Sequence, residues 1–526
     1  MDAPLHHGSA AIAATGAATA QQAPTSPIRK RTAYEDLQLF SQVLNQIRLN
    51  HPDSIDSHEM FMAAIEGLVR AADPHSYVLP ATRLVPEKER ALRDGKLYPV
   101  PITFAFFGGS PVVVSVAPGS AAGKLDVLPG DELVAVDSQS VSAESAEELE
   151  IMLAGRKGLT VRLSLQRRRL DGSLVTLDRT VKRERVEETT AVPAAFLLDR
   201  ETGYIRVTTF ANEKAADDLH DAVGRLEKRG MGRLVLDLRD NGGGSLKQAA
   251  KVAGEFLPAG AVVYTAQYRK KAKDDKDTVR VGRSFWSFSG EKRQPLVVLI
   301  NSGTASAAEL VAGALQDHDR ALIVGQASFG KALLMRGFPM ADGSVMVLVV
   351  GHIRTPCGRV IQREYRGVTR RDYFRLARAE RDTAGRPSCR TAGGRTVYGG
   401  GGIYPDIVLP HADPAPLWLA RVREDDLPLK WIGGYVTAAG ASLPSLDSLA
   451  ARPALPASAL ADFRTFARAQ GIEIPPTADE RLQQVLVRAV ALAKWGEEGY
   501  YRLAAVLDPA VTAAAKRFNR AAAILP

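Results

Sequence analysis

Short apolar runs alternate with segments of helical periodicity between about residues 195 and 410, and this alternation restricts the fold more than any other feature. The run "PLVVLI" (295–300) contains no charged side chain, as expected for a strand whose two faces are both covered. The runs "GYIRVTTF" (203–210), "GRLVLDLRD" (232–240) and "RALIVGQ" (320–326) follow the same theme. Strands that alternate with helices predict an α/β domain with a largely parallel central sheet.

The regions around this core have different patterns. Two helical segments come first, "YEDLQLFSQVLNQIRLN" (34–50) and "SHEMFMAAIEGLVRAA" (57–72), the second with Ser57 as its expected N-cap. A β-rich module of about 90 residues with one clear helix follows. The tail is rich in Ala, Leu and Pro, and its best helical segment is residues 478–495.

The first residues are small, polar and low in complexity, and they lack the apolar core of a signal peptide. They predict a disordered leader. The chain is therefore expected to be an α/β multidomain protein with a leader, an N-terminal helical region, a β-rich domain, an α/β core and a C-terminal helical extension: residues 1–32, 33–92, 93–186, 187–410 and 411–526.

Composition argues against several classes of function. The formal net charge is +9, but basic and acidic residues are interleaved, so a solvated surface is favoured and no nucleic-acid partner is expected. No run of 18 apolar residues is present, so no membrane span is expected. Two cysteines are too few for a cysteine-built zinc site, and the histidines match no ligand spacing, so neither a metal nor a cofactor is expected. Cys357 and Cys389 form either a disulfide or two buried thiols.

One serine and one lysine stand in unusually apolar surroundings. Ser306 follows the strand 295–300 and opens the helical segment "SAAELVAGALQ", so it is expected where free amide N–H groups begin a helix. Lys331 has apolar neighbours, and desolvation lowers the pKa of a lysine towards the range of a general base. A simple N-cap for Ser306 and a surface position for Lys331 are the alternatives.

A Gly-rich turn ends another apolar strand. In "LVLDLRDNGGGSL" (234–246) three glycines follow the strand, and such a turn can point backbone N–H groups at an oxyanion. His318 lies twelve residues along the helix from Ser306, about 18 Å away, so it is expected on the helix surface. His352 lies in an apolar strand and is expected in the core.

Together these segments resemble the carboxy-terminal processing peptidases, or tail-specific proteases. The matching segments come in family order: "DPHSYVLP", the PDZ-like "VVSVAPGSAAGKLDVLPGDELVAVD", "GYIRVTTF", "LVLDLRDNGGG", "LINSGTASAAELVAGALQDHDRALIVGQASFGK", "TPCGRVIQREY" and "YGGGGIYPDIVLP". The resemblance covers about 34–410, roughly 70 % of the chain. It implies an α/β peptidase core of the crotonase/ClpP-like kind with an inserted PDZ domain.

The resemblance also implies roles for single residues. The family's serine nucleophile falls on Ser306, and its lysine general base, 25 residues later, falls on Lys331. The backbone N–H groups that hold the oxyanion fall on Gly244, with Gly243 as the alternative, and on Ala307.

Three features depart from the family pattern. A glutamine that helps to orient the lysine is replaced by Met335, whose thioether is a weak acceptor, and Ala332 replaces a glycine. The Gly–hydrophobic–Gly loop of a PDZ domain is absent from the stretch 97–111. There, apolar side chains either line a peptide groove or belong to the core, and those proposed for the groove are Ile102, Phe104 and Phe106.

The leading hypothesis is a serine endopeptidase with a Ser–Lys dyad that engages unfolded or extended polypeptides through their C-terminal end. The alternative is an impaired or non-catalytic binding protein on the same scaffold, for which Met335 and the atypical PDZ loop speak. The resemblance places the protein in the bacterial periplasm or elsewhere outside the cytoplasmic membrane. A homo-oligomer is an arrangement that the sequence leaves open.

Overall fold

A computed structural model describes residues 32–79, 86–107, 109–117, 120–184, 190–268, 276–280, 294–379, 382–410 and 414–525. The leader expected at 1–32 lies outside these ranges apart from Thr32. The chain divides into two units, residues 1–67 and residues 68–526. Across the described residues, no helix combines the length and the apolar content that a membrane crossing requires.

The N-terminal unit contains two helices with many exposed apolar side chains. Helix α1 (Ala33–Asn50) buries no residue, although Thr32 and Glu35 form a capping box at its start. Helix α2 (Ser57–Ala72) begins at Ser57, but Asp56 is the side chain that caps it, through a bond of 2.8 Å from the N–H of His58. The expected N-cap at Ser57 is therefore wrong by one residue, because the carboxylate one position earlier accepts the free N–H.

A six-stranded antiparallel sheet forms the β-rich module, in the order β2-β3-β4-β6-β7 with β5 beside β4. Its helix α4 (Ala146–Leu153) starts at the cap Ser145, and α3 (Pro86–Arg93) precedes the sheet. The strands are β2 (Ile102–Phe107), β3 (Ser110–Val116), β4 (Glu132–Val136), β5 (Gln139–Ser140), β6 (Thr160–Arg168) and β7 (Leu174–Lys182). Alternating residues of β6 are buried, so one face of the sheet forms a small core.

The largest core surrounds a second six-stranded sheet with the order β19-β14-β13-β10-β9-β8. In this sheet β9, β10, β13, β14 and β19 run parallel to their neighbours, and β8 is antiparallel to β9. Among the named strands that the structure describes, the parallel pairs belong to this sheet, and most strand pairs are antiparallel. The strands are β8 (Ala194–Leu197), β9 (Thr202–Arg206), β10 (Arg233–Asp237), β13 (Leu296–Ile300), β14 (Leu322–Gly325) and β19 (Ile407–Val408).

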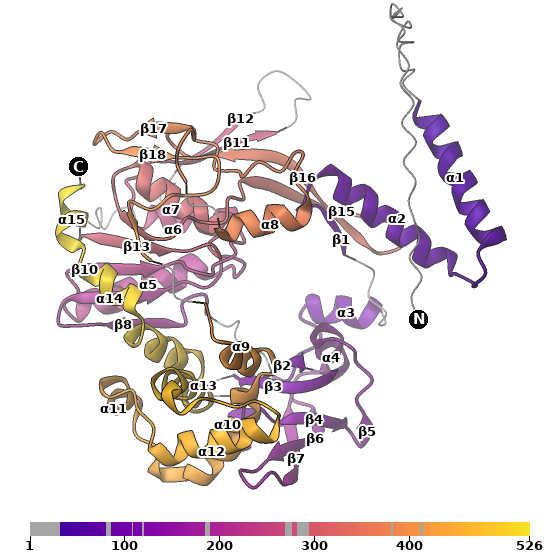
Figure 1. Cartoon of the computed structure of the whole chain (residues 1–526), viewed down its shortest axis with the longest axis vertical. Coiled ribbons are helices and arrows are strands. Elements are labelled where there is room, and N and C mark those ends of the chain that lie inside the picture. Colours follow the sequence, from indigo (N-terminus) through magenta and orange to yellow (C-terminus); the bar gives the residue numbers. More distant parts are fainter. Residues whose placement is uncertain are drawn as a thin grey trace, which may run out of the picture. The chain divides into compact units, whose positions relative to one another are not determined.

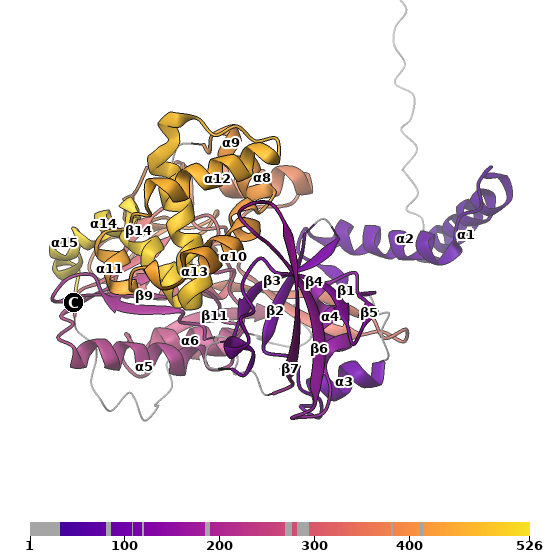
Figure 2. The same cartoon turned by 90° about the horizontal axis from the view of Figure 1, so that it is seen from below.

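Helices cover both faces of this sheet. Leu234 and Leu236 of β10 face α5 (Ala215–Lys228), α6 (Leu246–Gly254) and α7 (Ala307–Asp317), whereas Val235 faces the C-terminal helices. These are α13 (Asp479–Val506), which has a kink at Gly496, α14 (Pro509–Ala515) and α15 (Phe518–Ala523). Figure 2 shows α5 and α6 on the opposite side of β9 from α14 and α15. The double cover explains why β13 has no polar position.

The remaining tail helices form a separate apolar cluster with the first part of α13. They are α9 (Leu417–Glu424), α10 (Leu427–Ala439), α11 (Leu446–Ala451) and α12 (Ala457–Ala469). The described part of the C-terminal region is helical, and part of it packs against one face of the α/β core.

Lys331 lies two residues before a strand of the next sheet. This sheet has five strands, all paired antiparallel (Figure 1). Its strand β16 (Val345–Arg354) pairs with β15 (Leu333–Pro339) along one edge and with β1 (Tyr77–Leu79) and β11 (Val262–Tyr268) along the other. Strand β12 (Lys276–Arg280) completes it beyond β11. Helix α8 (Arg370–Ala379) and the hairpin of β17 (Ser388–Arg390) and β18 (Thr396–Tyr398) follow β16.

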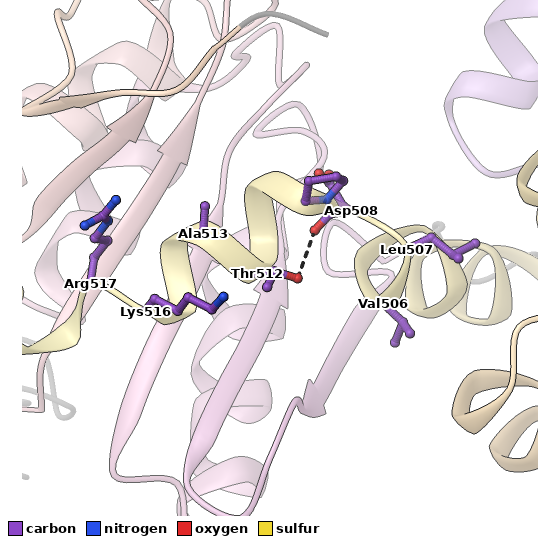
Figure 3. A pocket seen from close by; sticks show the side chains of 8 residues that line it. Val506, Leu507, Asp508, Thr512, Ala513, Lys516 and Arg517 are labelled. Atoms are coloured by element: carbon purple, nitrogen blue, oxygen red, sulfur yellow. Dashed lines mark hydrogen bonds between the residues drawn. The ribbon is translucent and has the colours of Figure 1, made fainter. Parts of the chain in front are cut away.

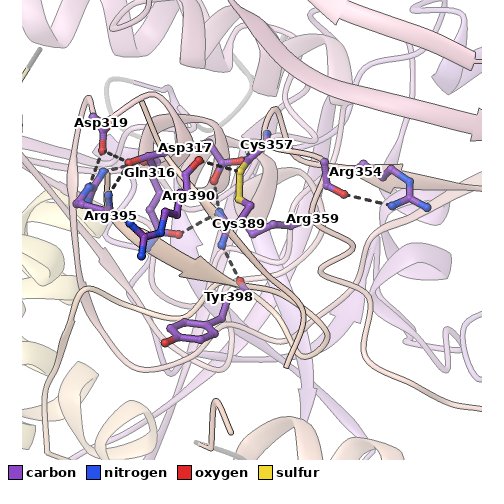
Figure 4. The surroundings of a disulfide bond; sticks show 12 residues. Gln316, Asp317, Asp319, Arg354, Cys357, Arg359, Cys389, Arg390, Arg395 and Tyr398 are labelled. Atoms are coloured by element: carbon purple, nitrogen blue, oxygen red, sulfur yellow. Dashed lines mark hydrogen bonds and ion pairs between the residues drawn. A yellow bond between two sulfur atoms is a disulfide. The ribbon is translucent and has the colours of Figure 1, made fainter. Parts of the chain in front are cut away.

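A disulfide joins Cys357, in the loop after β16, to Cys389 in β17 (Figure 4). The N–H of Cys357 donates to Asp317 at the end of α7 over 2.9 Å, and Arg359 forms a buried ion pair with the same carboxylate. Of the two alternatives that the sequence left open, the structure has the disulfide. The bond and the ion pair fix the loop that leads to Gln362.

Candidate active site

Ser306 occupies a strained turn between β13 and α7. Its φ of 54° and ψ of −118° lie in a region that L side chains rarely adopt, although the residue has a Cβ. Serine nucleophiles at strand-to-helix turns share this kind of strain, because the turn lifts the side chain clear of the backbone. Ser306 is partly exposed, whereas all of α7 behind it is buried.

The Gly-rich turn after β10 packs directly on the turn that contains Ser306, residues 301–306, which is the serine turn below. The N–H of Ala305 donates to the carbonyl of Asn241 over 2.9 Å, and Thr304 Oγ1 donates to the carbonyl of Leu238 over 2.8 Å. A Cβ on Gly243 would lie 2.8 Å from the backbone nitrogen of Ala307 and 2.9 Å from Ser306 Cβ. Any side chain at this position would push the two turns apart, so glycine is required here.

The two glycines of the turn differ in what their N–H groups do. The N–H of Gly243 donates to Asn241 Oδ1 over 2.9 Å and is therefore occupied. Gly244 (φ 135°) follows, and neither its N–H nor that of Ala307 at the start of α7 donates to an acceptor among the described residues. The N–H groups of Gly244 and Ala307 are thus free to bind a further acceptor beside Ser306.

The buried carboxylate of Glu309 links the serine turn to the loop that contains Lys331, residues 326–332, which is the lysine loop below. Its Oε2 accepts the N–H groups of both Ser306 and Lys331, each over 2.8 Å, so these two backbone nitrogens are no farther apart than twice that distance. Its Oε1 accepts from Ser328 Oγ over 2.5 Å and from the N–H of Gly330 over 2.7 Å. Burial raises the pKa of Glu309 to about 7, against the four hydrogen bonds, which favour the carboxylate.

Lys331 is a desolvated amine with few partners. Burial lowers the pKa of its ammonium group, and the charges of Glu309 and Asp73 oppose that shift only in part. Among the residues that the structure describes, none forms a hydrogen bond with Lys331 Nζ. Lys331 is half-buried, which argues against a fully solvated surface position for this lysine.

Met335 lies in β15, four residues after Lys331. It pairs with Val349 next to a register shift between Leu334 and Met335, and it is half-buried. Ala332, the other departure, is fully buried, and its N–H donates to Gln362 Oε1 over 2.8 Å.

A second cluster of polar and aromatic side chains packs beside Lys331. His75 Nε2 lies 2.8 Å from the hydroxyl of Tyr373, which also accepts a bond of 3.2 Å from Gln362 Nε2. The ring of Phe329 contacts the rings of both His75 and Tyr373, with centroids 6.1 and 6.0 Å apart. Burial, and then the charge of Lys331, lower the pKa of His75 to about 4, so the imidazole is neutral at physiological pH.

The residues proposed for a peptide groove are placed differently. Ile102 and Phe104 are buried in the core of the β-rich domain, and Phe106 is half-buried against it. Strand β2 itself is an edge strand of its sheet, so its backbone can still accept an added strand.

The two single histidines have ordinary surroundings. His318 caps the end of α7, and its Nε2 lies 2.7 Å from the carbonyl oxygen of Val262. His352 is exposed on β16, so its expected core position is wrong; the strand alternates, and position 352 falls on the open face.

Other candidate sites are few. Within the described part of the chain no group of three potential ligands could hold a metal ion. A hollow of about 510 Å³ lies along α14 and is lined by Val506–Pro509, Thr512, Ala513, Lys516 and Arg517 (Figure 3). All of these residues come from one C-terminal segment, and none belongs to the turns around Ser306.

Sequence reasoning missed Glu309, Gln362 and Tyr373. Glu309 had a visible signal, because Ser-x-x-Glu at the start of a helix is a capping-box pattern. Gln362 and Tyr373 lay in or near quoted segments, but only the tertiary fold brings them to Lys331. The structure brings Ser306, Gly243 and Ala307 into contact and ties Ser306 to Lys331 through Glu309.

Comparison with known proteins gives matches across most of these segments. The family model of peptidase family S41 matches residues 201–371, and a PDZ-domain model matches residues 112–167. A carboxy-terminal-processing protease of Bartonella bacilliformis is 30 % identical over 347 residues, which span 63 % of this chain and 74 % of that protein. Carboxyl-terminal-processing peptidase 2, chloroplastic, of Arabidopsis thaliana is 33 % identical over 320 residues, 58 % of this chain and 59 % of that protein. The solved structure of a photosystem II D1 C-terminal processing protease aligns with a TM-score of 0.34 at 24 % identity, covering 77 % of this chain and 92 % of that one.

Proposed function

This chain belongs to peptidase family S41, the carboxy-terminal processing proteases, and from this premise we propose that it is a serine endopeptidase with Ser306 as nucleophile and Lys331 as general base. The observation that carries the proposal is the shared acceptor: the N–H groups of Ser306 and Lys331 donate to the same Oε2 of Glu309. Two residues 25 positions apart are thereby held at one place.

The proposed reaction begins with proton transfer from Ser306 Oγ to the neutral amine of Lys331. The lowered pKa of Lys331 supports this step, because a larger share of the amine is neutral at a given pH than for a solvated lysine. Oγ forms a bond to the carbonyl carbon of the scissile peptide, and the carbonyl oxygen becomes an oxyanion. The free N–H groups of Gly244 and Ala307 are assigned to this oxyanion, and Gly243 supports them by close packing.

The intermediate then collapses in two stages. The C–N bond breaks as the Lys331 ammonium returns its proton to the leaving amine, which leaves an ester on Ser306. A water molecule gives a proton to Lys331 and forms a bond to the ester carbon. The bond between that carbon and Ser306 Oγ then breaks, Oγ takes the proton from Lys331, and the new carboxyl end is released. No group outside this chain and water is needed to balance either stage.

The proposed substrate is an unfolded or extended polypeptide that is engaged through its C-terminal end. Two observations support it, the match to a PDZ-domain model and the edge strand β2, because PDZ domains bind an extended peptide as an added strand. The burial of Ile102 and Phe104 limits the groove lining to more exposed positions such as Phe106.

An impaired enzyme is the second candidate, and Met335 is the observation that favours it. The thioether cannot replace an amide as a hydrogen-bonding partner of Lys331. A binding protein on the same scaffold would retain the PDZ domain and show no turnover.

The cellular setting is proposed from the disulfide. Cystine bonds persist in oxidising compartments, so the Cys357–Cys389 bond supports a periplasmic or otherwise exported location. We also retain as proposals the crotonase/ClpP-like arrangement of the core, the five domain ranges and a homo-oligomeric assembly, for which the exposed apolar side chains of α1 are an argument.

One experiment tests the function. The full chain, Ser306→Ala and Lys331→Ala are incubated with an unfolded protein that carries either a free or an amidated C-terminus. Cleavage by the wild type alone, faster with the free carboxylate, is the expected result. Equal product from wild type and Ser306→Ala would exclude the peptidase. Equal cleavage of the two substrates would leave the peptidase and remove recognition of the terminal carboxylate.

A further inference from the structure

Lys331 needs an orienting device other than the side chain four residues downstream. Met335 offers no strong acceptor, and no described residue forms a hydrogen bond with Lys331 Nζ. The direction of the amine must then come from the backbone of the lysine loop and from the side chains packed around it.

The lysine loop is attached to one buried side chain, Tyr373, on both sides of Lys331. On one side, the ring of Phe329 contacts the ring of Tyr373. On the other, the N–H of Ala332 donates to Gln362 Oε1, and Gln362 Nε2 donates to the Tyr373 hydroxyl. Tyr373 itself is fully buried on α8, so its side chain can restrain both Phe329 and, through Gln362, Ala332.

The hydroxyl of Tyr373 is also bonded to the segment before β1. His75 Nε2 lies 2.8 Å from it, and the rings of His75 and Tyr373 meet edge-on with centroids 5.2 Å apart. The backbone of His75 is fixed in turn by Asp73 Oδ1, which accepts its N–H over 2.7 Å. The hydroxyl oxygen of Tyr373 thus joins Gln362, eleven residues earlier on the chain, to the distant segment of His75.

We propose that Tyr373 is a positioning residue for Lys331, and that the hydrogen-bonded chain His75–Tyr373–Gln362–Ala332 fixes the lysine loop in place of the family's glutamine at position 335. The proposal rests on the peptidase function proposed above. The hydroxyl accepts from Gln362, and its own proton is directed at Nε2 of the neutral imidazole. Gln362 is thereby oriented with its carbonyl oxygen towards the N–H of Ala332.

Tyr373→Phe tests this proposal, because it removes the oxygen atom and keeps the ring. The expected result is a fall in kcat of about tenfold with KM changed by less than about twofold, since the lysine is misplaced and the peptide site is untouched. The acid limb of the kcat/KM profile should also move, because a loosened amine has different solvation. Glu309, Asp73 and His75 face Lys331, so the profile has to be interpreted together with these three groups.

A second substitution separates positioning from a general loss of packing. Met335→Gln restores the family side chain, so it should raise kcat several-fold in the Tyr373→Phe background and by less than about twofold in the wild type. Equal effects in the two backgrounds would overturn the proposal, and so would an unchanged kcat in Tyr373→Phe. Tyr365→Phe is the matched control, because the Tyr365 ring also touches Tyr373 and its hydroxyl lies outside the chain of bonds; its kcat should stay within about twofold of the wild type.

Thermal unfolding of each variant shows whether it is folded. If Tyr373→Phe does not fold, Gln362→Met removes the same chain from its other end at nearly the same volume, and the same fall and rescue are required of it. The two proposals fail in different ways. Absence of cleavage by the wild type above the Ser306→Ala background refutes the peptidase function, whereas normal turnover by Tyr373→Phe refutes only the role of Tyr373.

Discussion

The carboxylate of Glu309 accepts hydrogen bonds through both of its oxygens. The loss of any of the four donated bonds would loosen the turn from which it comes. Three of the four are backbone N–H groups, of Ser306, Gly330 and Lys331, and these cannot rotate away as a hydroxyl can. A protonated carboxyl group could direct its O–H only at Ser328 Oγ, and the bond that this hydroxyl donates to Oε1 would then be lost. The ionised form therefore matches the geometry, and the site should depend on it.

The pH dependence of turnover follows from two groups that must both lose a proton. In the proposed mechanism Glu309, with a pKa raised to about 7, is ionised to hold the turns, and Lys331, with a pKa lowered from its usual value, is neutral to act as a base. Both requirements fail as the pH falls. The logarithm of kcat/KM should therefore rise with pH with a slope approaching two below about pH 7 and a slope of one above it. A pH–rate profile with a small peptide substrate measures this.

Glu309→Gln isolates the contribution of the carboxylate. The amide group would face one of the backbone N–H donors, so we expect a loss of about 1–3 kcal/mol in stability and about a hundredfold in kcat. Its residual activity should rise with pH with a slope of one throughout. Glu424→Gln, on the exposed face of α9, is the control and should behave as the wild type. A slope of one in the wild type itself would contradict the role given to Glu309.

At the scale of the elements, the disulfide anchors the segment that reaches the lysine loop. Cys357 lies five residues before Gln362, and the bond to Cys389 closes a loop with a sequence separation of 32. Loop-closure entropy predicts a contribution of about 3–4 kcal/mol to the free energy of unfolding. Addition of a reductant should therefore lower the melting temperature by several degrees. Thermal unfolding with and without the reductant measures it, and the variant Cys357→Ser/Cys389→Ser should show no response. An equal shift in that variant would refute the assignment.

The elements of the core were the part of the fold that the sequence revealed best. Strand β13 and helix α7 could be predicted from the sequence. The short apolar run of β13 is typical of a strand that is covered on both faces, and the small and apolar residues of α7 are typical of a buried helix. Ser306 and Lys331 could be proposed from the sequence because their segments resemble those of the family. The contacts of Glu309, Gln362 and Tyr373 could not, because hydrogen bonds across a fold leave no period in the sequence. His352 was misplaced for a related reason, since an apolar strand does not reveal which of its faces is open.

At the scale of the whole chain, the C-terminal helices are part of the α/β core. They cover the face of the sheet to which Val235 and Val297 point, and Asp508 forms an ion pair of 2.7 Å with Arg239, which follows β10. Arg239 and Arg206 both bind the fully buried Asp237, so the tail is connected to the strand that leads to the Gly-rich turn. The C-terminal helices contain no catalytic motif, but through these ion pairs they help to hold the strand before the Gly-rich turn in place.

Phe518→Ala tests whether that support is packing alone. Phe518 of α15 is 4 % exposed, and Arg233 lies over its ring, 5.1 Å from the centroid. Its loss should cost about 3–5 kcal/mol of stability, because the cavity lies between the tail and the sheet. Leu417→Ala, at a position that is 77 % exposed, should cost little. Well below the melting temperature, kcat of Phe518→Ala should equal that of the wild type, since the ion pair of Asp508 and the turns around Ser306 are unchanged. A fall in kcat of more than about threefold in the folded protein would show instead that the tail sets the geometry of the Gly-rich turn.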